Sequence, residues 1–305
     1  MDLLGIGMMA VWGVTAALLA GYAAVVAGDV TYVTLADGRR QERSIPLLFK
    51  LLLPLVGNLD RLVARPLFAR QIALADELLV SGGFEGVLNG REFVAIKLLC
   101  PILIGTLWCF AVLSLGAVFM ESAVNDMTVP CCVLGFAYFY LQPMMWLRRA
   151  VKLRHLSIMK ALPFVLDLLT LSVEAGLDFI SALQRNCKSR RMDALNEELL
   201  RMTKEIQIGV SRKEALRNMA ERVKQPDLKS VACALIQADE LGVSIGSILR
   251  IQSEQLRDRR FDRAEKLASE APTKMLGPLM LCIFPSVFII LLGPVLSQAM
   301  KGSLF

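Results

Sequence analysis

The densest cluster of charged side chains holds four arginines within seven residues, namely Arg257, Arg259, Arg260 and Arg263. A guanidinium is a planar fork of donors that recognises carboxylates and phosphates, so this cluster suits recognition better than bond cleavage. Two interpretations remain open. The cluster is a docking face for a cytosolic partner, or it is a solvated helix face stabilised by i,i+4 pairs such as Asp262 with Lys266.

One short motif has the spacing of a catalytic serine. Gly242-Val-Ser244-Ile-Gly246 matches the G-x-S-x-G elbow, in which a strand precedes the serine and a histidine completes the triad further along the chain. Here a helical pattern precedes Ser244, and the single histidine, His155, lies 89 residues upstream. The motif therefore favours a helix cap, and a membrane-anchored hydrolase using Ser244 is kept as an alternative.

Other signatures of chemistry are missing from the sequence. It has no G-x-x-x-x-G-K-[ST] phosphate loop and no C-x-x-C pair among its seven cysteines, which are expected to be free packing thiols. The formal net charge of +6 comes from basic residues interleaved with acids and few aromatics, so nucleic acid is not an expected partner. We expect no catalytic residue, no cofactor, no metal site and no enzymatic activity.

The helices that position these residues are separated by a short sequence motif that repeats every 33 residues. Each copy has a glycine suited to the left-handed end of a helix, followed two residues later by a side chain that caps the next helix. The three copies give the turn and cap positions Gly176 and Asp178, Gly209 and Ser211, and Gly242 and Ser244. Ser211-Arg-Lys-Glu214 also has the spacing of a capping box.

Helical periodicity runs through the polar block between residues 148 and 274. Apolar residues recur three and four apart, and Pro226 suits the first turn of a helix. The predicted helices cover residues 156–175, 178–188, 193–208, 212–223, 226–241 and 245–269, the last ending before Pro272. Short glycine-containing turns between amphipathic helices predict a compact six-helix antiparallel bundle, with a helical-hairpin solenoid as the alternative.

The polar block is flanked by segments too apolar for a soluble protein. Four segments without a charged residue, each 21 to 26 residues long, are long enough to cross a bilayer as helices: 3–28, 98–120, 127–147 and 275–300. A further apolar stretch, 44–56, is too short and is expected at the interface or packed between helices. The fold class predicted is an all-α membrane protein with about four transmembrane helices and a cytosolic bundle.

The distribution of basic residues predicts the orientation. The loop 121–126 has two acidic residues and no basic one, whereas 148–274 has 24 Lys and Arg against 17 Asp and Glu. We therefore expect five regions: transmembrane helix 1 in 1–28, a small cytosolic helical region in 29–97, helices 2 and 3 in 98–147, the main cytosolic domain in 148–274, and helix 4 with a short tail in 275–305. The basic surplus also favours contact with membrane lipids.

The order and spacing of several short segments resemble the F-domain family of type II secretion, and within it the TadC-like proteins of Tad (Flp, type IVc) pilus assembly. The resemblance covers roughly residues 156–298. It rests on Leu162-Pro-Phe-Val-Leu-Asp, Glu174-Ala-Gly-Leu, Gly209-Val-Ser-Arg-Lys-Glu-Ala-Leu, Ile236-Gln-Ala-Asp-Glu-Leu-Gly, Arg257-x-Arg-Arg, Ala264-Glu-Lys-Leu-Ala and Ala271-Pro-Thr-Lys-Met-Leu. Two departures are Thr273, where valine is usual, and Glu221-Arg-Val-Lys224, where Arg-Thr-Gly commonly follows the glutamate.

The resemblance implies a bacterial inner-membrane, multi-pass platform protein with its main helical domain in the cytoplasm. Its implied partners are a TadB-like paralogue, a hexameric secretion ATPase and the pilin, in an oligomer or hetero-oligomer. Such a platform couples the ATPase to insertion or removal of pilins at the filament base. The alternatives are a TadB-like paralogue of the same platform and a permease subunit of an ATP-driven transporter.

Overall fold

The computed structural model describes residues 32–34, 40–42, 46–56, 63, 66–119 and 122–302. The first predicted span, 3–28, lies outside these residues. Two three-residue strands, β1 (Tyr32–Thr34) and β2 (Arg40–Glu42), pair antiparallel with Tyr32 opposite Glu42. They add a short ribbon to a region that the sequence predicted as helical, and the rest of the described chain is built from helices.

A small helical unit follows the strands. It contains α2 (Leu47–Val56), the 3₁₀ turn η1 (Pro66–Phe68), α4 (Ala69–Gly82) and α5 (Gly90–Cys100). Phe49 of α2 is fully buried, with its ring centroid 6.3 Å from that of Phe93 and 4.9 Å from that of Trp146. Within the described part of the apolar stretch 44–56, Phe49, Leu52 and Val56 are buried between helices, which is one of the two placements expected for the stretch.

The membrane helices continue directly from this unit. α5 passes through a π-helical turn, η2 (Pro101–Gly105), into α6 (Thr106–Phe119), and α6 packs against α7 (Ser122–Glu174). In the described part of the chain, three helical segments are long and apolar enough to cross a membrane: Gly90–Leu113, Val129–Glu174 and Ile245–Pro294. The predicted class of an all-α membrane protein is confirmed.

Six helices form the polar bundle around one core. They are the second half of α7, then α8 (Phe179–Ser189), α9 (Ala194–Gln207), α10 (Arg212–Val223), α11 (Pro226–Leu241) and the first part of α12 (Ile245–Gly302). Ile158, Leu162 and Leu166 of α7 lie in this core, whereas Leu147 and Val151 of the same helix lie in the core of the small unit. One helix thus joins the two cores.

Two prolines lie inside long helices. Pro163 lies well inside the 53-residue α7, which begins at Ser122 and not at the predicted residue 156. The helix predicted to end before Pro272 instead continues for 58 residues to Gly302. A proline removes one backbone hydrogen bond and kinks a helix, but ending the helix beside the apolar layer would leave more backbone groups unpaired. The predicted boundary at residue 269 is therefore wrong.

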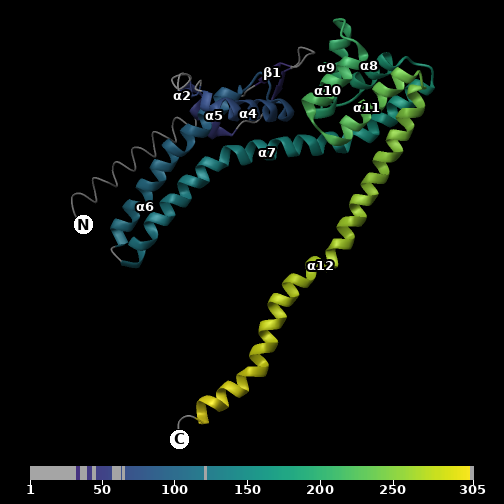
Figure 1. Ribbon diagram of the computed structural model, residues 1–305. Coiled ribbons are helices and arrows are strands. Elements are labelled where there is room, and N and C mark those ends of the chain that lie inside the picture. Colours follow the sequence, from purple (N-terminus) through teal and green to yellow (C-terminus); the bar gives the residue numbers. More distant parts are fainter. Residues whose placement is uncertain are drawn as a thin grey trace.

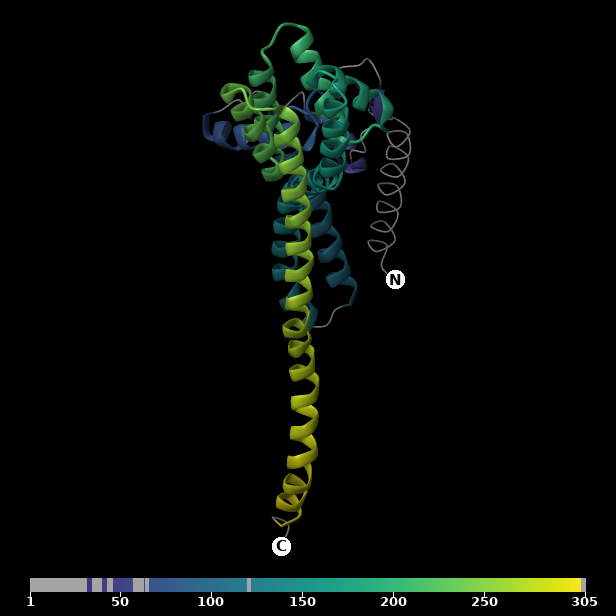
Figure 2. The ribbon, with the colours of Figure 1, turned by 90° about the vertical axis from the view of Figure 1, so that its right-hand side faces the viewer.

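α12 gives the molecule its elongated shape. It leaves the bundle as a long rod that extends beyond the tip of the α6–α7 hairpin in both views (Figures 1 and 2). The most apolar part of this rod has none of its residues buried inside the chain.

The cysteines are free, as expected, but only some of them pack in the interior, since Cys131, Cys233 and Cys282 are exposed. All seven are free, with Cys100 and Cys187 buried. Burial raises the pKa of the Cys187 thiol to about 11, so this thiol is protonated and unreactive at neutral pH.

Candidate functional site

The arginine cluster lies on α12 where this helix crosses α7 and α11. Arg257 Nη2 is 2.5 Å from Asp167 Oδ2 of α7, and the Ser253 hydroxyl donates a hydrogen bond to the other oxygen of the same carboxylate. Two turns nearer the start of α12 than Arg257, Arg250 Nη2 lies 2.7 Å from Glu174 Oε1. These contacts form a ladder of ion pairs along the line where α12 packs on α7.

Asp227, in the first turn of α11, pairs with two further arginines of the cluster, Arg259 and Arg263. Its oxygens lie 3.1 Å from Arg259 Nη1 and 2.9 Å from Arg263 Nη2, and its side chain is only 6% exposed. Burial raises the pKa of the Asp227 carboxyl, but hydrogen bonds from Arg263 and Arg259 outweigh burial, so the net pKa is below its usual value. The carboxylate is therefore ionised at neutral pH and holds α12 on α11.

Arg260 donates a hydrogen bond to a backbone carbonyl of α7 that has no helical donor because a proline lies four residues later. Its Nη2 donates to the carbonyls of Met159 at 3.0 Å and Lys160 at 2.7 Å. In an α-helix the Met159 carbonyl would accept from the N–H of the residue four positions later, but that residue is Pro163, which has none. The side chain of α12 thus satisfies the backbone group that the proline in α7 leaves free.

All four arginines therefore face other helices of the same chain. Their side chains are not buried: those of Arg257, Arg259 and Arg263 remain 57%, 44% and 45% exposed. Among the described residues, no ion pair forms between Asp262 and Lys266, the pair expected for a solvated helix face. The cluster stabilises the crossing of α12 and keeps about half of its donor surface accessible.

The partners of these arginines were missed from the sequence. Asp167 and Asp227 precede their arginines by 90 and by 32 or 36 residues, and no local spacing connects them. A cap pattern was visible only for Asp227, which follows Pro226 at the start of α11.

The repeated turns occupy the joints between the bundle helices. Gly176, Gly209 and Gly242 have φ of +92°, +102° and +68°, where a Cβ is disfavoured. Asp178 accepts a hydrogen bond from the Ile180 N–H at 3.0 Å, and Ser211 accepts from the Glu214 N–H at 3.2 Å.

Ser244 directly precedes α12 and follows helix α11, so the strand that a catalytic elbow requires is replaced by a helix. His155 lies on α7, with its Nε2 2.7 Å from the Val223 carbonyl.

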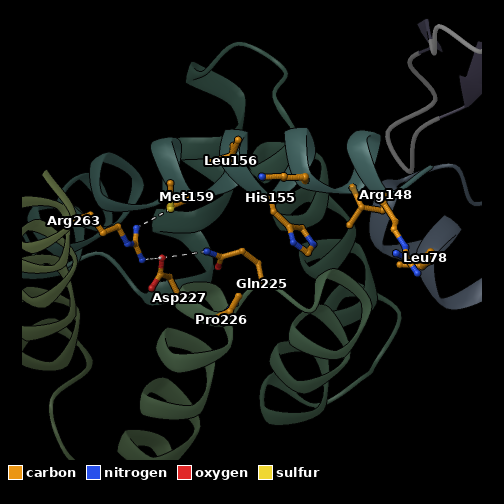
Figure 3. A pocket seen from close by; sticks show the side chains of 11 residues that line it. Leu78, Arg148, His155, Leu156, Met159, Gln225, Pro226, Asp227 and Arg263 are labelled. Carbon is orange, nitrogen blue, oxygen red and sulfur yellow. Dashed lines mark hydrogen bonds and ion pairs between the residues drawn. The ribbon is translucent and has the colours of Figure 1, made fainter. Parts of the chain in front are cut away.

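A cavity adjoins the Asp227 contacts. Its volume is about 400 Å³, and it opens between α4, α7, α11 and α12 (Figure 3). The close-up shows His155 pointing from α7 toward Gln225 and Pro226, with Arg263, Asp227 and Met159 at one end and Arg148 at the other. Over the part of the chain that is described, no group of three or more His, Cys, Asp or Glu side chains could hold a metal ion.

Comparison with known protein families assigns the region that carries these contacts. Residues 165–293 match the family model of type II secretion system protein F, from the second half of α7 into the last span. The chain contains a type II secretion system F domain. This match includes the three glycine turns and all four arginines, whereas Met159 and Lys160, which Arg260 contacts, precede it. No curated protein and no solved structure matches the chain significantly.

The F domain is a domain of membrane proteins of secretion and pilus platforms. Proteins of this family generally work with secretion ATPases and with partner platform proteins. The apolar helices agree with a location in the inner membrane.

Proposed function

We propose that the chain is a TadC-like platform protein of a Tad-type pilus machine, without enzymatic activity of its own. It pairs with a TadB-like paralogue, responds to a hexameric secretion ATPase, and moves pilins into or out of the filament base. The observation that supports this proposal is the continuity of α7 and α12, which run from the F domain into apolar segments without a break.

A continuous helix transmits displacement because its axial hydrogen bonds resist bending and stretching. Two such helices leave this F domain, and the ion pairs of Arg257, Arg259 and Arg263 join α12 to α7 and α11 near the point where they diverge. A push on the bundle would therefore move both membrane helices together. A bundle attached through flexible linkers would lose that displacement in the linkers.

The exposed half of the arginine cluster is the surface that we propose for contact with the ATPase. Guanidinium groups already paired on one side still present N–H donors on the other. The orientation proposed for the chain, with the F domain in the cytoplasm and loop 121–126 outside, places this surface on the side where ATP is available.

Co-purification tests the assignment of partners. The full chain, expressed with its genomic neighbours and purified in mild detergent, is expected to carry a paralogous platform protein and a secretion ATPase. A deletion strain is expected to lack pili. Normal piliation in that strain, with neither partner co-eluting, contradicts the proposal, and ATP-dependent solute flux in reconstituted vesicles would support the permease alternative.

A charge swap separates ATPase contact from internal attachment. Arg257→Asp removes both, whereas Arg257→Asp combined with Asp167→Arg restores the internal pair with its polarity reversed. If Arg257 contacts the ATPase, the single and the double variants both lose piliation at normal protein levels. Rescue by the swap would show that Arg257 acts only in holding α12. Arg191→Glu is the matched control, because Arg191 is exposed and makes no ion pair with any described residue.

A further inference from the structure

The cavity beside His155 combines an apolar wall with two cations that have no ion-pair partner among the described residues. Leu78 of α4, Val151, Leu156 and Met159 of α7, and Pro226 of α11 supply the apolar wall. Arg148 and Lys152 also line the cavity, one turn apart on α7. Such a lining suits an amphiphilic ligand with a negative head.

The end of the cavity lined by Arg148 and Lys152 carries a net positive charge. The one carboxylate in its wall, Asp227, is neutralised by Arg259 and Arg263. Glu77, next to Leu78 on α4, forms an ion pair with Lys224. Arg148 and Lys152 make no ion pair or hydrogen bond with any residue that the structure describes, so their donors are available.

The depth of these two cations matches a phosphate layer. Arg148 directly follows the uncharged part of α7, and Lys152 stands about 6 Å further along the helix axis. The headgroup layer extends roughly 5–8 Å beyond the hydrocarbon on each side of a bilayer. Lipid phosphates therefore lie at the level of the cavity's open, basic end.

We propose that this cavity binds the headgroup of an anionic phospholipid, with its phosphate between Arg148 and Lys152. The carbon atoms of the headgroup and glycerol then pack on Leu78, Val151 and Leu156. A lipid bound in this way touches α4, α7 and α11 at once, so it stabilises the joint between the small helical unit and the F domain. The site requires only that α7 crosses the membrane, and it holds whichever pilus subunit the chain proves to be.

Native mass spectrometry of the detergent-purified full chain measures the binding. Phosphatidylglycerol is titrated against phosphatidylcholine for the wild type, Arg148→Gln, Lys152→Gln and the control Arg149→Gln. Arg149 is adjacent to Arg148, carries the same charge and is exposed, but it does not line the cavity. Loss of one charge-assisted hydrogen bond predicts phosphatidylglycerol affinity about tenfold lower for Arg148→Gln and Lys152→Gln, with Arg149→Gln within twofold of wild type.

Two results would overturn the proposal. An equal loss in Arg149→Gln and Arg148→Gln means that lipid is attracted only by general charge at the membrane surface. Displacement of bound phosphatidylglycerol by millimolar inorganic phosphate or glycerol phosphate means that the cavity takes a soluble anion instead. Both Arg148 and Lys152 are exposed and unpaired among the described residues, so their neutralisation leaves the fold intact as a valid background.

Discussion

At the scale of single residues, the attachment of α12 depends on ion pairs with carboxylates of α7 and α11, and the α11 carboxylate is largely shielded from water. Asp227 is the clearest case, since two guanidinium groups and the Gln225 amide all donate to it. A single buried anion with several donors stabilises strongly while it is charged and not at all once it is protonated. The crossing of α12 over α11 should therefore depend on pH.

The first prediction concerns acid stability. The pKa of Asp227 is lowered in the folded chain. Its stabilising effect is thus fully present above the unfolded pKa of about 4 and is lost as pH falls through the lowered folded pKa. Asp227→Asn should lower the unfolding free energy by about 1–3 kcal/mol at pH 7, and this difference from wild type should shrink progressively as the pH falls below about 4. Thermal unfolding of the detergent-purified chain measures it.

Asp262→Asn serves as the control, because Asp262 is exposed and has no ion-pair partner among the described residues. A difference between wild type and Asp227→Asn that stays constant from pH 7 to pH 2 would contradict the assigned role of the carboxylate.

Lys224 gives a second prediction. It caps α10 with φ +54°, a left-handed conformation that costs a non-glycine residue about 1 kcal/mol. A glycine at this position would adopt the left-handed conformation without strain. Lys224→Gly should be about 1 kcal/mol more stable than Lys224→Ala, because both lose the exposed pair with Glu77 but only glycine relieves the strain. Equal thermal unfolding midpoints for the two variants would refute this account.

At the scale of helices, the helix boundaries could be predicted from the sequence, whereas the ion pairs between residues far apart in the chain could not. The bounds predicted for residues 212–223 and 226–241 agree with α10 (Arg212–Val223) and α11 (Pro226–Leu241), because Ser211, Pro226 and Gly242 act locally. The arginine cluster was visible too, but its partners are set by how α12 packs. No periodicity within one helix encodes that packing.

The contact between Arg260 and α7 yields a third prediction. Pro163→Ala restores an N–H that can bond to the Met159 carbonyl, so the Arg260 side chain should matter less in that background. Arg260→Met should cost about 1–3 kcal/mol in the wild type and clearly less with Pro163→Ala. A double-mutant cycle of thermal unfolding measures the coupling. Strictly additive effects would show that Arg260 does not act by satisfying the carbonyl that the proline leaves free.

At the scale of the whole molecule, a second group of charges holds the small helical unit against the F domain. Arg154 of α7 is 5% exposed and contacts Glu197 at 2.9 Å and Glu198 at 2.8 Å, both on α9. Its guanidinium also lies so close to Gly83, the left-handed cap of α4, that a Cβ there would come within 2.1 Å of Nη1. The two cores therefore meet around one buried arginine.

The fourth prediction tests this joint. Arg154→Met removes the buried cation shared by Glu197 and Glu198, and Glu198 keeps only a longer contact of 3.5 Å to Arg222, so the substitution should cost about 3–5 kcal/mol. Arg201→Met is the comparison, since its pair with Glu85 has both side chains at least 40% exposed and should contribute at most about 1 kcal/mol. Limited proteolysis and thermal unfolding report the loss. Similar effects of the two substitutions would show that burial does not set the strength of this joint.

Because α12 is one continuous helix, it also fixes how its membrane-spanning part is rotated about the helix axis relative to the bundle. Successive residues of an α-helix are rotated by about 100°, so the direction that each apolar side chain of the span faces is determined by its residue count from the bundle. Adding one residue between Phe261 and Met275 would turn the whole apolar surface by about a quarter of a circle, whereas adding seven would nearly restore it. The number of residues between the bundle and the bilayer thus determines which side of the last span faces its neighbours in the membrane.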